Sequence, residues 1–191
     1  MSTPAEHGFR ELVFSDYGRY RDAANASWLK VVALCLTNPG MLASLILRAQ
    51  QCLYRAGKAR PAMVLRTVGT VLVGADFGPG MQVGTGLLMP HPVGVNIGYG
   101  LTIGDGVSLA AGVTAAARYY DDRGEQEFAT ICDGATLGAH AVLVGGVRVG
   151  VNAVVGANAV VLSDVPDNAV VFGSPARRVG TRDDGAAAAT G

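Results

Sequence analysis

The sequence predicts a mainly β fold, a parallel β-helix of hexapeptide repeats, preceded by an N-terminal α-helical segment. The first observation is that an aliphatic residue or Met stands at every sixth position in two runs. The runs are Val83, Met89, Val95, Leu101, Val107 and Val113, and then Ile131, Leu137, Leu143, Val149, Val155 and Val161. The second observation is that the later run keeps the phase of the earlier one, because the step from Val113 to Ile131 is again a multiple of six. A period of six is typical of parallel β-helices, in which three flat faces make one coil.

Each face of such a coil is expected to direct one compact apolar side chain into the narrow interior. The residues that follow would make the turns, because Gly, Asn and Asp tolerate tight backbone conformations. The stretches 95–100 and 101–106 show this pattern, and 27 of the 191 residues are glycine. A Gly-rich sandwich of short strands is the alternative, but its strands would not keep one phase across the gap between the runs.

Charge and cysteine content argue against several classes of protein. The net charge is zero, so nothing indicates a nucleic-acid partner or a charged membrane surface. Cys35, Cys52 and Cys132 are scattered and show neither a metal-ligand spacing nor a disulfide framework, which suits a reducing cytoplasm. The apolar stretch 28–47 contains a lysine and is broken at 38–40, so we expect no membrane span.

Residues 1–68 are expected to form the N-terminal helical segment. The apolar stretch 28–36 predicts a buried helix, and residues 41–56 predict a second one after a Pro-Gly break. Residues 60–72 fit either a further short helix or a first irregular strand. These helices are too apolar to stand alone, so we expect them to pack on the coil or on another subunit.

Residues 69–180 are expected to form the β-helix. The segment 114–130 is charged and aromatic, so it cannot fill the interior along its whole length and should protrude as a loop. Residues 170–179 are expected to fold over the open end of the coil as a cap. The tail, residues 181–191, is expected to be disordered.

His91 is the best candidate for a catalytic group among the three histidines. It lies between Pro90 and Pro92, which would fix its backbone and aim its ring. Asp76 precedes it by slightly less than the three hexads of one coil, so we expect the two residues on successive coils with nearly superposed chain positions. A carboxylate there could hold the imidazole in one tautomer and leave its other nitrogen free as a base. The alternative for His91 is a subunit contact.

The repeat, Asp76 with His91, the excursion near 114–130 and the ending 172–180 together resemble the serine acetyltransferases. The resemblance covers residues 70–180 well and the helical segment more weakly. It implies a left-handed parallel β-helix that is usually a trimer or a dimer of trimers. It implies acetyl-CoA as acyl donor, no metal, His91 as general base and Asp76 as its orienting carboxylate. The form of residues 90–94 is most similar to shorter serine-acetyltransferase-like proteins of polysaccharide or secondary-metabolite pathways.

The resemblance also implies a CoA site in the groove between the coils of neighbouring subunits, formed largely by main-chain groups. The edges that would line it contain the small residues Ala111, Ala116, Gly138, Ala139 and Ala157. Arg177 and Arg178 could meet the CoA phosphates. The alternative for these two arginines is a solvated C-terminal cap.

Several positions depart from the serine-specific pattern of this family. Pro90 stands where an Asp precedes the catalytic histidine, and Glu127 and Phe128 stand where an Arg-His pair helps to hold the substrate carboxylate. A substrate carboxylate beside Glu127 would be unfavourable without a counter-charge. Arg118 or Arg123 could supply that charge. All five residues are therefore candidates for substrate binding.

Three functions are consistent with these residues. The first expectation is an acetyl-CoA-dependent O-acetyltransferase that acts on a hydroxyl of a sugar or small metabolite, which His91 deprotonates. The second is serine O-acetylation with a rebuilt substrate loop. The third is a non-catalytic trimeric scaffold that retains the fold. We expect a cytoplasmic homotrimer or a dimer of such trimers.

Overall fold

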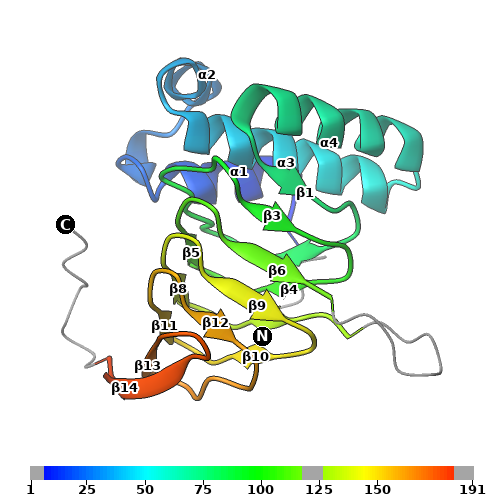
Figure 1. The fold of residues 1–191 in the computed structure, drawn as a ribbon. Helices are drawn as coiled ribbons and strands as arrows, with labels where there is room; N and C mark the ends of the chain where they lie inside the picture. The colour runs from blue at the N-terminus through cyan, green and yellow to red at the C-terminus, as the bar shows by residue number, and fades with distance from the viewer. Residues whose placement is uncertain (1–6, 118–126, 183–191) are drawn as a thin grey trace.

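A stack of β-coils lies beneath a layer of helices in the computed structural model, which describes residues 7–117 and 127–182 (Figure 1). The strands form three sheets, one along each face of the coil. All described strand pairs are parallel except the last, β13 with β14. The arrangement is therefore a parallel β-helix with a helical cap at its N-terminal end.

The elements of the cap are α1 (Phe9–Tyr17), the 3-10 turn η1 (Ala23–Asn25), α2 (Trp28–Thr37), α3 (Pro39–Arg55) and α4 (Ala59–Val73). The first sheet contains β1 (Asp76–Phe77), β3 (Asn96–Ile97), β6 (Thr114–Ala116), β9 (Val142–Val144) and β12 (Val160–Val161). The second contains β2 (Gln82–Val83), β4 (Thr102–Ile103), β7 (Thr130–Ile131) and β10 (Arg148–Val149). The third contains β5 (Ser108–Leu109), β8 (Thr136–Leu137), β11 (Val154–Val155), β13 (Ala169–Phe172) and β14 (Arg177–Thr181).

The twelve hexad positions are all buried, and none is more than 2% exposed. The expectation of one inward side chain per face is wrong, because each face contributes two. Residues two apart on a strand share a side, so Ile103 is buried with Leu101 and Ala135 with Leu137. In the lower coils the second inward residue is mostly alanine: Ala129, Ala135, Ala141, Ala153 and Ala159. A large aliphatic residue beside an alanine fills a narrow interior without overpacking.

The common phase of the two hexad runs does not reflect equivalent positions in the coil. Ile131 pairs with Ile103, the second inward residue of its face, and not with a member of the first run. Ile131 pairs with Val149 of the next coil, three hexads farther along the chain, so three hexads make a regular coil. Ile131 also pairs with Ile103 of the preceding coil, but the step between these two residues is ten positions longer than three hexads. Ten is not a multiple of six. The pattern stays in phase because both inward positions of each face are apolar.

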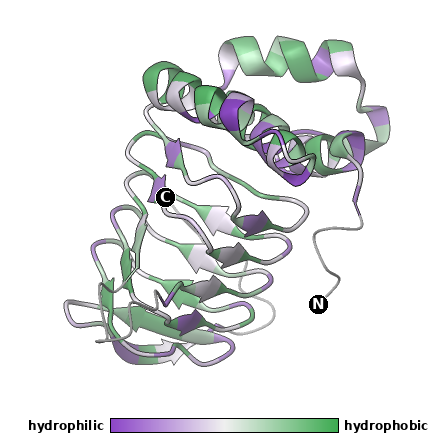
Figure 2. Cartoon of the chain, turned by 90° about the vertical axis from the view of Figure 1, so that its right-hand side faces the viewer, coloured by the Kyte–Doolittle hydropathy of each residue, from purple (hydrophilic) through white to green (hydrophobic). Residues whose placement is uncertain are grey.

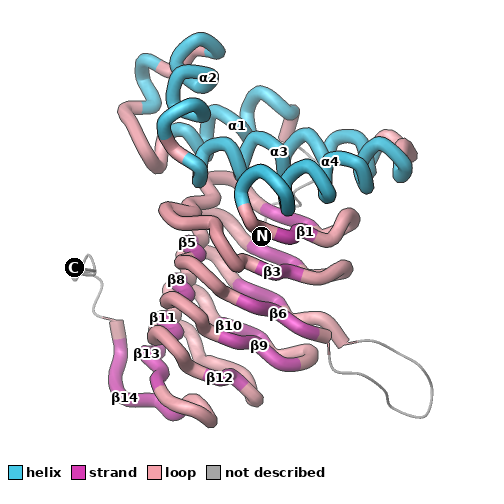
Figure 3. Tube along the Cα trace, turned by 45° about the horizontal axis from the view of Figure 1, so that its top comes forward, coloured by secondary structure: helices cyan, strands magenta, loops and turns pink. Residues whose placement is uncertain are grey.

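The helical cap extends beyond the expected boundary at residue 68, because α4 continues to Val73. Residues 60–72 are therefore helical, and the first strand begins at Asp76. Gly74 ends α4 in the left-handed conformation, with φ of +68°, which glycine adopts without a steric penalty. Figure 3 shows the cyan helices crossing the upper end of the coil, with α3 and α4 next to β1.

Polar side chains of the cap bind the backbone of the first coil, which has no coil above it. Arg48 donates to the carbonyl oxygens of Val83 and Gly84, and Gln50 donates to that of Phe77. A buried backbone group without a partner is costly. These side chains therefore take the place of the hydrogen bonds that a preceding coil would make.

A buried ion pair links α1 and α3 at this junction. The carboxylate of Asp16 accepts from Nε and Nη2 of Arg48, both at 2.8 Å, and from the Leu87 N–H. Both side chains are 0% exposed. Burial raises the pKa of Asp16, so the carboxylate depends on Arg48 to remain ionised.

At the other end of the molecule, the chain reverses after β13 and β14 pairs with it as an antiparallel strand. The expected tail begins too early, because Thr181 belongs to β14 and the Arg182 N–H donates to the Asn168 carbonyl. Residues 183–191 lie outside the described residues. The expected loop, residues 114–130, is shorter at both ends, because β6 includes residues 114–116 and β7 begins at Thr130. Residues 118–126 of this loop lie outside the described part of the chain.

The hydropathy colouring of Figure 2 shows green, hydrophobic stretches along the helices of the cap. Leu29 and Leu36 of α2 are 81% and 83% exposed, and Val71 of α4 is 77% exposed. Within residues 7–117 and 127–182, no helix is both long and apolar enough to cross a membrane.

Candidate active site

His91 lies in a corner of the first coil that is longer than the corner beneath it. Five residues, 90–94, separate the buried residues Met89 and Val95, whereas three residues, 110–112, make the corresponding corner below. The two additional residues must bulge out of the regular coil. The side chain of His91 is exposed on this bulge.

Four corners between the third and first sheets stack along one edge, which we call the His91 edge. They comprise residues 90–94, 110–112, 138–140 and 156–158. Backbone hydrogen bonds join them, from the N–H groups of Gly112, His140 and Asn158 to the carbonyl oxygens of Val93, Ala111 and Ala139 respectively. The edge is thus a regular ladder with His91 at its upper end.

Four of the five small residues predicted for CoA binding lie on the His91 edge: Ala111, Gly138, Ala139 and Ala157. All four are at least partly exposed. Because their side chains are small or absent, a ligand that lies along this edge could reach the main chain. Ala116 is the exception, since it lies at the far end of the first sheet, where its carbonyl accepts from the Gly145 N–H.

The two predicted phosphate-binding arginines lie on β14, and both are exposed. Arg177 pairs with Phe172, and Arg178 pairs with Val171. The ring of Phe172 packs over Gly156, which belongs to the His91 edge. Arg177 therefore lies beside the lower end of that edge.

Asp76 does not superpose on His91, and this expectation is wrong. Its partner in the adjacent coil is Asn96, five residues beyond His91, because of the longer corner. The Asp76 carboxylate binds the guanidinium of Arg66 through two hydrogen bonds, of 2.5 and 2.7 Å. Within the described residues, no hydrogen bond joins Asp76 to His91.

Arg66 controls the charge of this carboxylate. Its hydrogen bonds hold the pKa of Asp76 below the ordinary value of 3.8. The guanidinium also lies over the ring of Tyr99, with 5.6 Å between the guanidinium carbon and the ring centroid. Asp76 is thus ionised and fixed on the outer face of the first sheet.

The predicted substrate residues lie on two different edges. Pro90 is exposed beside His91. Phe128 and Glu127 lie on the opposite side of the first sheet, at the corners between the first and second sheets, which we call the loop edge (residues 78–80, 98–100, 117, 127–128 and 145–146). The Phe128 ring packs over Gly100, where a β-carbon would collide with it, and Glu127 contacts Gly146. Arg118 and Arg123 lie outside the described residues.

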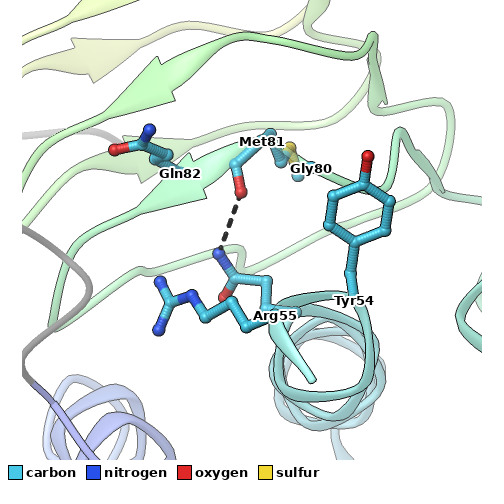
Figure 4. Close-up of a pocket in the computed structure, with 6 residues that line it drawn as sticks. Tyr54, Arg55, Gly80, Met81 and Gln82 are labelled. Atoms are coloured by element: carbon cyan, nitrogen blue, oxygen red, sulfur yellow. Dashed lines mark hydrogen bonds between the residues drawn. The ribbon is translucent and has the colours of Figure 1, made fainter. Parts of the chain in front are cut away.

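A cavity of about 320 Å³ opens between α3 and the first coil (Figure 4). It is lined by Gln51, Tyr54, Arg55, Gly80, Met81 and Gln82. Gln51 donates to the Met81 carbonyl oxygen at 3.4 Å. None of the predicted site residues lines this cavity.

Two residues next to the candidate groups escaped the sequence patterns. Arg66 lies on a stretch whose secondary structure was ambiguous, and Tyr20 lies between α1 and η1, where no periodicity marks it. The Tyr20 hydroxyl bonds to both the N–H and the carbonyl of Met89, two residues before His91. The Tyr20 contact joins segments distant in sequence, and the Arg66 contact joins a helix to the strand that follows it, so neither follows from the hydrophobic pattern of a single element.

Comparison with known proteins places the chain among acetyltransferases, although no family model matches it. Serine acetyltransferase 4 of Arabidopsis thaliana is 32% identical over 94% of this chain, and the chain spans 50% of that protein. Serine acetyltransferase of Mycobacterium tuberculosis is 33% identical over 85% of this chain and 69% of its own length. The chain thus spans about half to two thirds of these relatives.

A solved structure shows the same architecture. The serine acetyltransferase of Brucella abortus strain S19 in complex with coenzyme A has a TM-score of 0.79 and 28% identity, over 94% of this chain and 70% of the other. The likeness confirms the expected fold class, a left-handed parallel β-helix with an N-terminal helical segment.

Proposed function

Since the chain belongs to the serine acetyltransferase family, we propose that it is an acetyl-CoA-dependent O-acetyltransferase with His91 as general base. The observation that carries the proposal is the His91 edge, on which an exposed histidine and four accessible small residues share one ladder of corners. The CoA complex of the Brucella relative supports placing the acyl donor on this fold.

In the proposed reaction, His91 takes the proton from the acceptor hydroxyl as its oxygen attacks the thioester carbonyl. The tetrahedral intermediate collapses, the carbon–sulfur bond breaks, and the leaving CoA thiolate takes the proton from His91, which restores the base. The products are the O-acetyl ester and free CoA. A main-chain amide of the His91 edge would stabilise the oxyanion, as buried amides do in other acyl transfers.

For Asp76 we retain a positioning role, now together with Arg66. The carboxylate is ionised and its two oxygens have further lone pairs beyond those that Arg66 uses. We propose that the imidazole N–H reaches this carboxylate only in the substrate complex. Catalytic hydrogen bonds are often longer in free enzymes than in their complexes.

We propose L-serine as the principal acceptor, because the relatives are serine acetyltransferases. This choice favours the second of the three functions considered from the sequence. Another hydroxyl compound is the second candidate, since Phe128 packs on its own coil at Gly100 and cannot donate to a substrate carboxylate. Pro90 likewise offers no charge beside His91.

We propose a homotrimer as the active assembly. One chain carries its base and four of its CoA-site residues on the His91 edge, but Glu127 and Phe128 on the loop edge and Ala116 at the end of β6 next to that edge. Neighbouring subunits of a closed ring bring different surfaces together. A trimer would therefore combine the His91 edge of one chain with the loop edge of the next.

The acceptor is tested by thiol release from acetyl-CoA with L-serine, L-serine methyl ester and a panel of sugars. We expect the highest kcat/KM with L-serine, and a marked loss with the ester if the site recognises the carboxylate. Equal turnover of serine and its methyl ester would refute carboxylate recognition and support the second candidate. No thiol release above background with any compound would favour the non-catalytic scaffold.

A further inference from the structure

Tyr20 binds the backbone just before the His91 corner. Its hydroxyl donates to the Met89 carbonyl oxygen and accepts from the Met89 N–H, both at 3.0 Å. Met89 is completely buried and lies two residues before His91. We propose that Tyr20 is a positioning residue for the general base, a role that rests on the proposed function of His91.

Met89 needs these hydrogen bonds because it lies on the upper rim of the first coil. Its neighbour Leu88 bonds to the coil below, donating to the Val107 carbonyl and accepting from the Leu109 N–H. Successive residues of a strand direct their backbone groups to opposite neighbours. The N–H and the carbonyl group of Met89 therefore face the cap, where the Tyr20 hydroxyl forms a hydrogen bond with each of them.

The N-terminus of α3 contacts the same peptide group. Gly40 packs so closely that a β-carbon there would overlap the Met89 carbonyl oxygen and lie 2.7 Å from the Tyr20 hydroxyl. Met89 is thus enclosed by the cap on its upper side. The two prolines around His91 stiffen the chain that follows, so a displacement of Met89 is transmitted to the histidine.

Tyr20 acts through hydrogen bonds rather than by proton transfer. Burial raises the pKa of Tyr20 to about 12, so its hydroxyl is neutral near pH 7. A neutral hydroxyl donates and accepts at once, which is what the two Met89 groups require.

The test compares Tyr20→Phe with Ser15→Ala, which also removes one hydroxyl between the cap and the first coil. Ser15 accepts from the Gly86 N–H at 3.0 Å, farther along the chain from His91. The readouts are kcat and KM with acetyl-CoA and the preferred acceptor, and the imidazole NMR signals. Only three histidines contribute such signals, and His91→Ala identifies the one of interest.

We expect Tyr20→Phe to lower kcat about tenfold, with KM for acetyl-CoA changed by less than about twofold, because misplacement of a catalytic group affects turnover. The His91 signal should shift or broaden. Ser15→Ala should change neither kcat nor the signal. Identical kcat values and His91 signals in the two variants would overturn the proposal. If the parent protein transfers no acetyl group, the proposed function fails, and the NMR comparison alone still decides whether Tyr20 positions His91.

Discussion

The ion pair of Asp76 and Arg66 fixes the charge on the outer face of the first sheet, between the His91 edge and the loop edge. Both side chains are partly exposed, at 28% and 30% respectively, so the pair is worth about 1 kcal/mol or less. Since Arg66 lowers the pKa of Asp76, the pair stabilises the fold in full at pH values above 3.8, the ordinary pKa of this carboxyl group. That contribution is lost as the pH falls through the lowered pKa.

Replacement of Arg66 should therefore destabilise the protein in a pH-dependent manner. We expect Arg66→Met to lower Tm by a few degrees at pH 7, and by less at pH 3, where the Asp76 carboxyl of the unfolded chain is largely protonated and the contribution of the pair is smaller. Thermal unfolding followed by circular dichroism measures this. Arg60→Met, an exposed position on the same helix, is the control and should have no such effect. An equal loss for Arg66→Met at both pH values would contradict the assignment.

Among individual residues, the sequence could single out Asp76 and His91 as candidates, but it could not show which contacts fix their positions. His91 is marked by its flanking prolines, and Asp76 by its distance along the chain. The assumed coil of three hexads placed them too close together, because two additional residues in the His91 corner change the register. Arg66 and Tyr20 act from other elements, and such contacts leave no local pattern.

Among the elements, the helical cap replaces the coil that is missing above the first one. Four of the five buried polar residues in its described part, Asp16, Arg48, Gln50 and Gln51, would be anomalous in an apolar junction. They are explained by the first-coil carbonyl and N–H groups that they bind. The cap thus stabilises the coil through specific hydrogen bonds as well as apolar contact.

Removal of Arg48 should cost far more than removal of an exposed arginine in the same cap. Arg48→Met leaves the Asp16 carboxylate buried without its cation, so we expect a loss of about 3–5 kcal/mol. Urea denaturation gives the free energy of unfolding. The control is Arg19→Met, which removes an exposed arginine that donates to the carbonyls of Gly86 and Gly106. Similar losses in both variants would exclude the buried ion pair as the main contribution.

The strands were more predictable than the cap. Every hexad position is buried, since the interior admits only apolar side chains at those points. The second inward series carries little signal in the later coils, where it is mostly alanine. In the earlier coils it is aliphatic, as at Ile97, Ile103 and Leu109, and cannot be told apart from the first series by hydropathy. The additional positions before β7 could not be counted either, because Leu101 and Ile103 both fit the pattern.

For the whole molecule, the proposed homotrimer would share each active site between two subunits, since the predicted site residues of one chain lie on two different edges. The His91 edge contains Ala139, whereas Ala116 lies on the far side of the first sheet. If a site forms between two chains, a defect on one edge can be complemented by a chain whose other edge is defective. Complementation therefore tests the assembly and the site together.

Mixed trimers of His91→Ala and Ala116→Glu chains should recover activity, although each variant alone is inactive. Random assembly leaves about a quarter of the sites with both edges intact. Initial rates after co-refolding measure this recovery. His91→Ala mixed with Ala139→Glu is the matched control, because both defects lie on the same edge and no intact site can form. Equal recovery in the two mixtures, or none in the first, would contradict a site shared in this way.

The most direct test of the account is the initial rate of acetyl transfer from acetyl-CoA to L-serine by the parent protein and His91→Ala. His7→Gln, a change at a histidine far from the His91 edge in the sequence, controls for the loss of a histidine as such. We predict that His91→Ala lowers kcat by about 10²–10⁴-fold, the range for loss of a general base, while His7→Gln keeps the parent rate. A His91→Ala protein that transfers acetyl groups at the parent rate would contradict the assignment of the base.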